Sequence, residues 1–205
     1  MLLLVSGATK TVERLKPHPH LGHLLSPRSR NDPNRFLSTG LPWAADNGAF
    51  SGFDPTAFVR MLNAIQGKPN CLFVVCPDIV ANAAETLSLF GRWREAIASR
   101  ALPVAYVAQD GQEQLPVPWE ECDALFIGGS TEFKLGRHAE SLAREARARG
   151  LLCHMGWVNS QRRMRLAHAW GCSSVDGTSF SWFPDAKLPR ALEHLDGLDR
   201  QGRLL

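Results

Sequence analysis

The 205-residue sequence has no apolar run approaching the roughly 20 residues that a membrane-spanning helix needs. The apolar stretch at residues 1–6 is too short for a secretory signal, and Lys10 follows it without an intervening hydrophobic region. The five cysteines are odd in number and widely spread, which favours buried free thiols in a reducing compartment over a disulfide framework. We therefore expect a cytoplasmic protein that has no membrane partner.

Motifs for metals and nucleotide cofactors are also missing. The sequence has no His-Glu-x-x-His motif, and Cys71 and Cys76 are too far apart to form a zinc-binding pair. Gly7 follows the first apolar stretch without the glycine-rich loop that binds a dinucleotide. His154 is a candidate ligand, but strand alternation predicts that it points away from the strand ends. We expect neither a metal nor a cofactor.

Basic residues are concentrated in two segments of a chain whose net charge is only +3. These segments, residues 10–35 and 162–165, could bind phosphates, or they could simply form solvated surface. The candidate nucleic-acid-binding residues are Lys10, Arg14, Arg30, Arg35, Arg162 and Arg163.

Short apolar stretches alternate with helical patterns along most of the chain. The predicted strands are residues 2–5, 43–46, 71–77, 104–109, 124–129, 151–155 and 173–176, and the predicted helices are residues 55–66, 82–100, 136–149 and 160–170. Apolar strands separated by helices indicate a parallel sheet that is covered on both faces. An eighth strand could lie at either end of the chain.

We expect an α/β fold, specifically a compact or incomplete (β/α)8 TIM-type barrel that occupies residues 1–205 as one domain. An open doubly wound sheet is the alternative. Five prolines predict a long basic loop at about residues 17–42. An irregular C-terminal tail is predicted after about residue 181, with a short helix near residues 190–195.

Polar residues follow many of the predicted strands, and in a barrel these strand ends share one mouth. Among them are Asp46, Asp78, Gln109, Gly128, Gly129 and Asp176. A single aspartate at a strand end is most often a helix cap. Asp46 and Asp176, however, lead into glycine turns and not directly into helices.

This set of side chains suits chemistry at a nucleoside. Two carboxylates in one pocket can divide into a nucleophile and a general acid/base for displacement at an anomeric carbon. A third carboxylate and a glutamine can bind the edge of a purine. Phe50 and Met155 could stack on the two faces of the ring, or they could simply fill the core.

Taken in order, these residues resemble the tRNA-guanine transglycosylase superfamily, in particular the phage and bacterial relatives that place 7-deazaguanine bases into DNA. The stretch Asp46-Asn47-Gly48-Ala49-Phe50 is similar to the family motif Asp-Ser-Gly-Gly-Phe/Tyr. Further similarities are Cys76-Pro77-Asp78, the segment Gln109-Asp110-Gly111, the pair Gly128-Gly129, and Met155-Gly156 followed by Asp176. Together the matches extend over residues 46–181.

The resemblance implies a role for each matched residue. Asp176 would be the nucleophile and Asp46 the general acid/base. The base would be bound by Asp78, Gln109, Gly128, Gly129, Phe50 and Met155. The sequence departs from the family at Asn47 and Ala49, and it has no Cys-x-Cys-x-x-Cys…His pattern for the zinc subdomain of the tRNA enzymes. This last departure favours DNA over tRNA as the nucleic-acid partner.

We therefore expect a transglycosylase that exchanges guanine for a 7-deazaguanine base in a polynucleotide, through a covalent intermediate and with retention. Two alternatives stay open: a glycosylase or nucleosidase in which water resolves the intermediate, and a non-catalytic barrel that binds a 7-deazapurine or nucleic acid. A partner protein or a second copy of the chain could complete the assembly.

Overall fold

The computed structural model describes residues 1–28 and 33–202, and the eight strands within them form a closed, all-parallel barrel. The strands follow one another around the ring in sequence order: β1 (Leu2–Val5), β2 (Leu21–Leu25), β3 (Trp43–Ala45), β4 (Cys71–Val75), β5 (Val104–Ala108), β6 (Ala124–Ile127), β7 (Leu152–Met155) and β8 (Ser174–Asp176). The ring closes where β1 pairs with β8, with Leu4 opposite Asp176. This architecture is the predicted TIM-type barrel.

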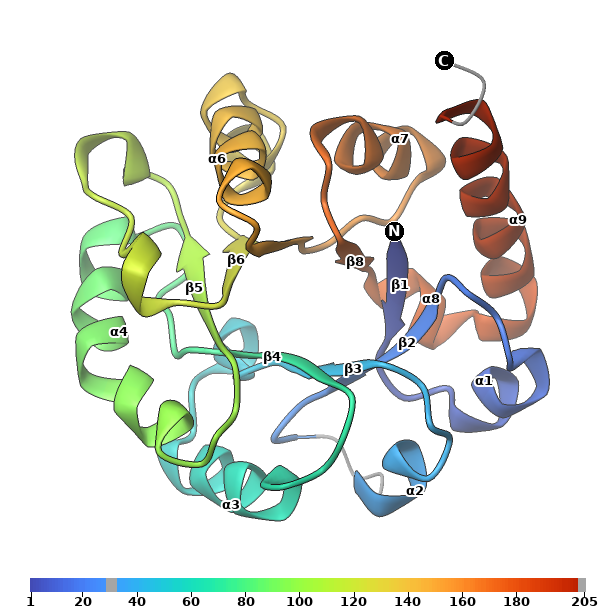
Figure 1. The fold of residues 1–205 in the computed structure, drawn as a ribbon, viewed down its shortest axis with the longest axis horizontal. Helices are drawn as coiled ribbons and strands as arrows, with labels where there is room; N and C mark the ends of the chain where they lie inside the picture. The colour runs from blue at the N-terminus through green and yellow to red at the C-terminus, as the bar shows by residue number, and fades with distance from the viewer. Residues whose placement is uncertain (29–32, 203–205) are drawn as a thin grey trace.

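Helices surround the ring of strands (Figure 1). They are α1 (Thr9–Leu15), α2 (Pro33–Leu37), α3 (Pro55–Ile65), α4 (Ala83–Ala98), α5 (Thr131–Lys134), α6 (Arg137–Ala148), α7 (Gln161–Trp170), α8 (Thr178–Trp182) and α9 (Pro184–Gly202). The four predicted helices are present as α3, α4, α6 and α7. In α3, Asp54 caps the first turn by accepting a hydrogen bond from the Ala57 N–H at 3.0 Å.

The predicted loop at residues 17–42 is wrong, because this segment contains β2 and α2. All five residues of β2 are buried, and its Leu21 pairs with Leu3 of β1. The prolines stand on either side of the strand and not within it, so they leave its hydrogen bonds intact. A Cβ at Gly22 would lie 2.7 Å from the Leu4 side chain and 2.8 Å from the Pro42 carbonyl, which directly precedes β3, so this close approach requires glycine. The eighth strand therefore lies inside the segment and not at an end of the chain.

The predicted irregular tail is also wrong, because α9 extends over Pro184–Gly202. Its buried face carries Leu188, Leu192 and Leu195, which recur at helical spacing. Pro189 lies in the second turn of this helix, where its missing N–H removes one backbone hydrogen bond. Packing of the leucine face against the barrel and the neighbouring helices outweighs that loss.

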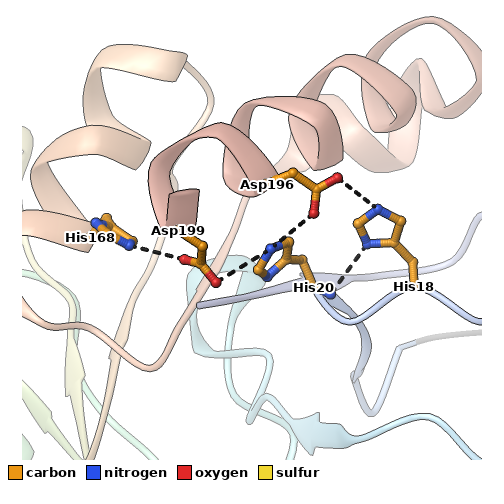
Figure 2. Close-up of polar contacts among 5 residues, drawn as sticks. All are labelled: His18, His20, His168, Asp196 and Asp199. Carbon is orange, nitrogen blue, oxygen red and sulfur yellow. Dashed lines mark hydrogen bonds and ion pairs between the residues drawn. The ribbon is translucent and has the colours of Figure 1, made fainter. Parts of the chain in front are cut away.

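Two aspartates of α9 fix the helix to the barrel and to α7 (Figure 2). Asp196 approaches the rings of His18 and His20 with O···N distances of 3.6 and 3.3 Å. Asp199 lies 3.2 Å from the Nε2 atom of His168 on α7 and 3.7 Å from that of His20. These contacts join the last helix to the segment between β1 and β2 and to α7.

The described residues form two apolar cores, one inside the barrel and one between the barrel and its helices. Inside the barrel, small side chains such as Ala44 and Ala105 leave room for Phe73, Phe126 and His154. The His154 ring centroid lies 4.7 Å from that of Phe126, so His154 points into the barrel. This corrects the sequence prediction that it points away from the mouth. Strand alternation sends Met155 and not His154 to the outer core.

All five cysteines lie in the described part of the chain as free thiols, four of them buried and Cys71 partly buried. The Sγ atoms of Cys153 and Cys172 are 3.8 Å apart. Within residues 1–28 and 33–202, no helix combines the length and apolarity that crossing a membrane requires.

Candidate functional site

A cavity of about 260 Å³ opens at the carboxyl ends of the strands. Its walls come from the segments that follow β3, β4, β5, β6, β7 and β8, so residues distant in sequence meet there. The predicted catalytic and base-binding residues that line it are Asp46, Phe50, Asp78, Gln109, Gly128, Gly129 and Asp176. Met155 is the one member of that set that the structure does not bring to the cavity.

Asp46 follows β3 directly, and its backbone N–H donates to the Leu25 carbonyl of β2 at 2.8 Å. Burial raises the pKa of the Asp46 carboxyl to about 7, and the negative charges of Asp176 and Asp78 add to the effect. The backbone N–H groups of Asn47 and Gly48 partly oppose this shift. A carboxyl with this pKa can give and take a proton near neutral pH.

Asp176 is the last residue of β8, and two donors contact the same carboxylate oxygen. Oδ1 accepts the Trp157 N–H at 3.0 Å and lies 3.3 Å from Nε2 of the buried His154. The other ring nitrogen of His154 is 2.8 Å from the Ser174 hydroxyl, which fixes the imidazole. Among the described residues, no hydrogen bond is made to Oδ2, so this oxygen is available to a ligand in the cavity.

Asp78 follows β4 as the centre of a buried amide–carboxylate network. Its Oδ1 accepts from Asn47 Nδ2 at 2.6 Å, and its Oδ2 accepts from Gln109 Nε2 at 2.5 Å. Burial raises the pKa of Asp78, while these two hydrogen bonds act in the opposite direction. The Ala81 N–H donates to Gln109 Oε1 at 2.9 Å, which orients the glutamine amide. Each carboxylate oxygen keeps a further lone pair for a ligand N–H.

Gly128 and Gly129 form the turn between β6 and α5, where the backbone itself borders the cavity. A Cβ at Gly128 would lie 3.0 Å from Gln109 Nε2, and one at Gly129 would lie 2.5 Å from Asp110 Oδ2. Gly129 also has φ +77°, a conformation that favours glycine. Asp110 holds the turn by accepting from the backbone N–H of Ser130 at 2.7 Å and from its hydroxyl at 2.5 Å.

Two aromatic rings stand at the opening of the cavity. Phe50 is 66% exposed, and its ring centroid lies 4.6 Å from that of Trp157. Met155, predicted as the second stacking face, is 1% exposed and belongs to the outer core. Trp157 takes the cavity position instead, because the turn after β7 carries it there with φ +62°. The sequence signal for Trp157 was an aromatic residue directly after a strand-end glycine.

Lys134 is a buried cation in the cavity wall that sequence reasoning did not single out. Its Nζ lies 5.2 Å from the centroid of the Trp157 ring. Burial lowers the pKa of Lys134, the nearby charges of Asp176 and Asp110 raise it, and Arg163 lowers it further. The signal in the sequence was a lysine on the first helical turn after the Gly128-Gly129 pair.

The predicted nucleic-acid-binding residues do not form one cluster. Arg163 donates to the Trp157 carbonyl at 3.1 Å beside the cavity, whereas Arg14 forms a 2.7 Å ion pair with Asp185 of α9. Lys10 and Arg162 are exposed and do not line the cavity. Arg30 and the side chain of Arg35 lie outside the described part of the structure.

Carboxylates are the charged groups of negative sign that line the cavity. Within the described residues, no group of three or more histidine, cysteine, aspartate or glutamate side chains is arranged to hold a metal ion.

Comparison with known proteins gives no family assignment. No family model matches the chain, and no curated protein matches its sequence. The TIM-type barrel itself is established by the closed ring of eight parallel strands.

Proposed function

We propose that this protein is a transglycosylase that exchanges guanine for a 7-deazaguanine base in a polynucleotide, with DNA favoured over tRNA. The observation that carries the proposal is a pair of unlike carboxyls in one small cavity. Asp46 has a pKa near 7, while Asp176 accepts two hydrogen bonds on one oxygen and presents the other. Such a difference in environment separates an acid/base from a nucleophile.

In the first step, Asp176 Oδ2 attacks the anomeric carbon and the bond from that carbon to the guanine nitrogen breaks. Protonated Asp46 donates its proton to the leaving base, so no anion is released. The chain then holds a covalent sugar ester at Asp176. The incoming 7-deazaguanine loses its ring N–H proton to ionised Asp46, its nitrogen attacks the same carbon, and the ester bond breaks. Two displacements give net retention.

The remaining cavity residues suit recognition of a purine. Asp78 can accept from the amino group and the ring N–H of guanine through its free lone pairs. The second N–H of the Gln109 amide and the backbone at Gly128-Gly129 can donate to the carbonyl side. Phe50 and Trp157 can cover a ring face. A cavity of about 260 Å³ has room for a purine ring. A base stacked inside a duplex cannot enter it, so the target base must leave its stack.

The test is incorporation of radiolabelled guanine into DNA and into tRNA, with denaturing electrophoresis to trap the covalent adduct. The Asp176→Asn protein should lose at least about 10³-fold in exchange rate and form no adduct. Asp54→Asn is the matched control, because Asp54 is an exposed helix cap that asparagine can replace. Exchange that survives in Asp176→Asn would refute the mechanism. Abasic sites instead of exchange would identify a hydrolase, and base binding without turnover would identify a binding protein.

A further inference from the structure

A second cavity, of about 560 Å³, lies between α7 and α9 on the outside of the barrel. Three arginines line it, Arg165 on α7 and both Arg190 and Arg200 on α9, together with the carboxylate of Glu193. Among the described residues, none of these three guanidinium groups has a hydrogen bond or an ion pair. The groove therefore carries an excess of positive charge that the described chain does not neutralise.

The other carboxylates of α9 near this groove are engaged elsewhere. Asp196 stands one helical turn before Arg200, but its two oxygens contact His18 and His20 (Figure 2). The two oxygens of Asp199 contact His168 and His20 in the same way. These imidazole contacts explain why Arg200 stays without an ion-pair partner.

His194 adds an imidazole with an unpartnered nitrogen to the lining of the groove. Its side chain lines the groove, and its Nε2 atom is buried without a hydrogen-bond partner. A buried polar atom that lacks a partner costs free energy. An anionic oxygen in the groove would recover that cost only if the imidazole turned to bring Nε2 to the groove surface.

The spacing of the arginines indicates an extended anion. Arg190 and Arg200 are ten residues apart on one helix, a rise of about 15 Å, which exceeds the reach of a single phosphate. Guanidinium groups match phosphate oxygens in geometry and charge. The groove also begins near the candidate active site, because Gln161 at the start of α7 lines it and Arg163 binds the Trp157 carbonyl at the cavity.

We propose that the α7–α9 groove binds the phosphodiester backbone of the polynucleotide strand whose target base enters the barrel. The identity of this occupant rests on the proposed function, while the charge of the groove does not. A strand leaving the cavity would pass Arg163 and continue along α7 into the groove.

The test is fluorescence anisotropy of a labelled oligothymidine at several salt concentrations. Removing three phosphate contacts in the triple variant Arg165→Ala, Arg190→Ala and Arg200→Ala should weaken binding at least tenfold at low salt. The slope of log K against log salt concentration should fall in magnitude by about 2, at about 0.7 for each phosphate of a single strand. The control variant combines Arg60→Ala, Lys68→Ala and Arg92→Ala, which removes the same charge from exposed positions on and beside α3 and α4. It should keep the wild-type slope.

The variant Glu193→Gln should increase the affinity for oligothymidine, a change that a folding defect would not produce. Removal of the only carboxylate among the groove residues described here should tighten oligothymidine binding severalfold. The proposal is overturned if the groove variant binds like the control variant, or if polyglutamate or inorganic phosphate displaces the strand at equal charge concentration. Oligothymidine contains no guanine, so its binding does not depend on base exchange. If the unmodified protein binds oligothymidine through the groove but exchanges no base, only the proposed function is contradicted.

Discussion

Asp46 and Asp176 are two carboxyls of the same chemical type to which the barrel gives different environments. The charge of Asp176 is one cause of the raised pKa of Asp46, so the protonation of Asp46 depends on this neighbour. Donors from Trp157 and His154 meet the Asp176 carboxylate, whereas burial dominates at Asp46. The proton therefore resides on Asp46 below about pH 7.

We predict that kcat/KM for base exchange declines as pH rises past about 7, because ionised Asp46 cannot protonate the leaving guanine. The Asp176→Asn substitution removes a neighbouring negative charge, so it should lower the pKa of Asp46. Carbon-detected NMR of labelled aspartate measures that pKa directly. An unchanged pKa in Asp176→Asn would mean that the two carboxyls do not interact.

The sequence predicts a site residue correctly when that residue lies at or just after the end of a strand. Asp46, Asp78, Gln109 and Asp176 reach the cavity because the carboxyl ends of parallel strands share one mouth. Met155 does not, because strand alternation turns it outward. Trp157 reaches the cavity because of a left-handed backbone turn, and Lys134 reaches it because of the short helix α5. Neither conformation is readable from hydrophobic pattern alone.

Among the elements, the turn between β6 and α5 borders the cavity with its backbone. Gly129→Ala should weaken guanine binding about tenfold or more, because its Cβ would meet Asp110 Oδ2 and displace the Ser130 contacts. Gly150→Ala is the matched control. Gly150 also has positive φ, at +76°, but its Cβ would meet nothing within 4 Å.

Gly150→Ala should cost about 1 kcal/mol of stability, since it forces alanine into a left-handed conformation. Gly129→Ala should cost more, because its Cβ also meets Asp110 Oδ2. Calorimetric titration with guanine measures the affinity, and thermal unfolding measures the stability. Equal affinity in the two variants would mean that the turn does not contact the base. Failure of the unmodified protein to bind guanine would count against the proposed function itself.

The strands and helices that the sequence missed share a physical reason. In β2, Gly22 and His23 interrupt the apolar run, and prolines stand on both sides, so local composition resembles a loop. Pairing with both β1 and β3 decides its conformation, and that pairing is not local. In α9, Pro189 is a local signal against helix that the buried leucine face overrides.

For the whole molecule, we predict that His23 makes the free energy of unfolding depend on pH. Burial lowers the pKa of this histidine from 6.5 to about 4, and it has Thr39 as a hydrogen-bond partner at 3.0 Å. Between pH 6.5 and pH 4, His23 is therefore protonated in the unfolded chain but not in the folded protein. The resulting loss of stability begins as pH falls below about 6.5 and is complete below about 4.

The expected contribution of His23 to this loss is about 3 kcal/mol, at about 1.4 kcal/mol for each pH unit between the two pKa values. His23→Gln keeps an amide for Thr39 but cannot titrate. Urea unfolding of both proteins between pH 7 and pH 4 isolates the difference, because the other groups are common to both. Parallel stability curves for the two proteins would exclude His23 as the source.

The pairing of β1 with β8 has a consequence for the order of events during synthesis on the ribosome. Asp176 sits opposite Leu4, so the strand that carries the proposed nucleophile needs a partner made about 170 residues earlier. The barrel cannot close until β8 has left the ribosome. Until then, one edge of β1 has no strand to pair with. A nascent chain therefore brings Asp46 and Asp176 into one closed barrel only after β8 has left the ribosome.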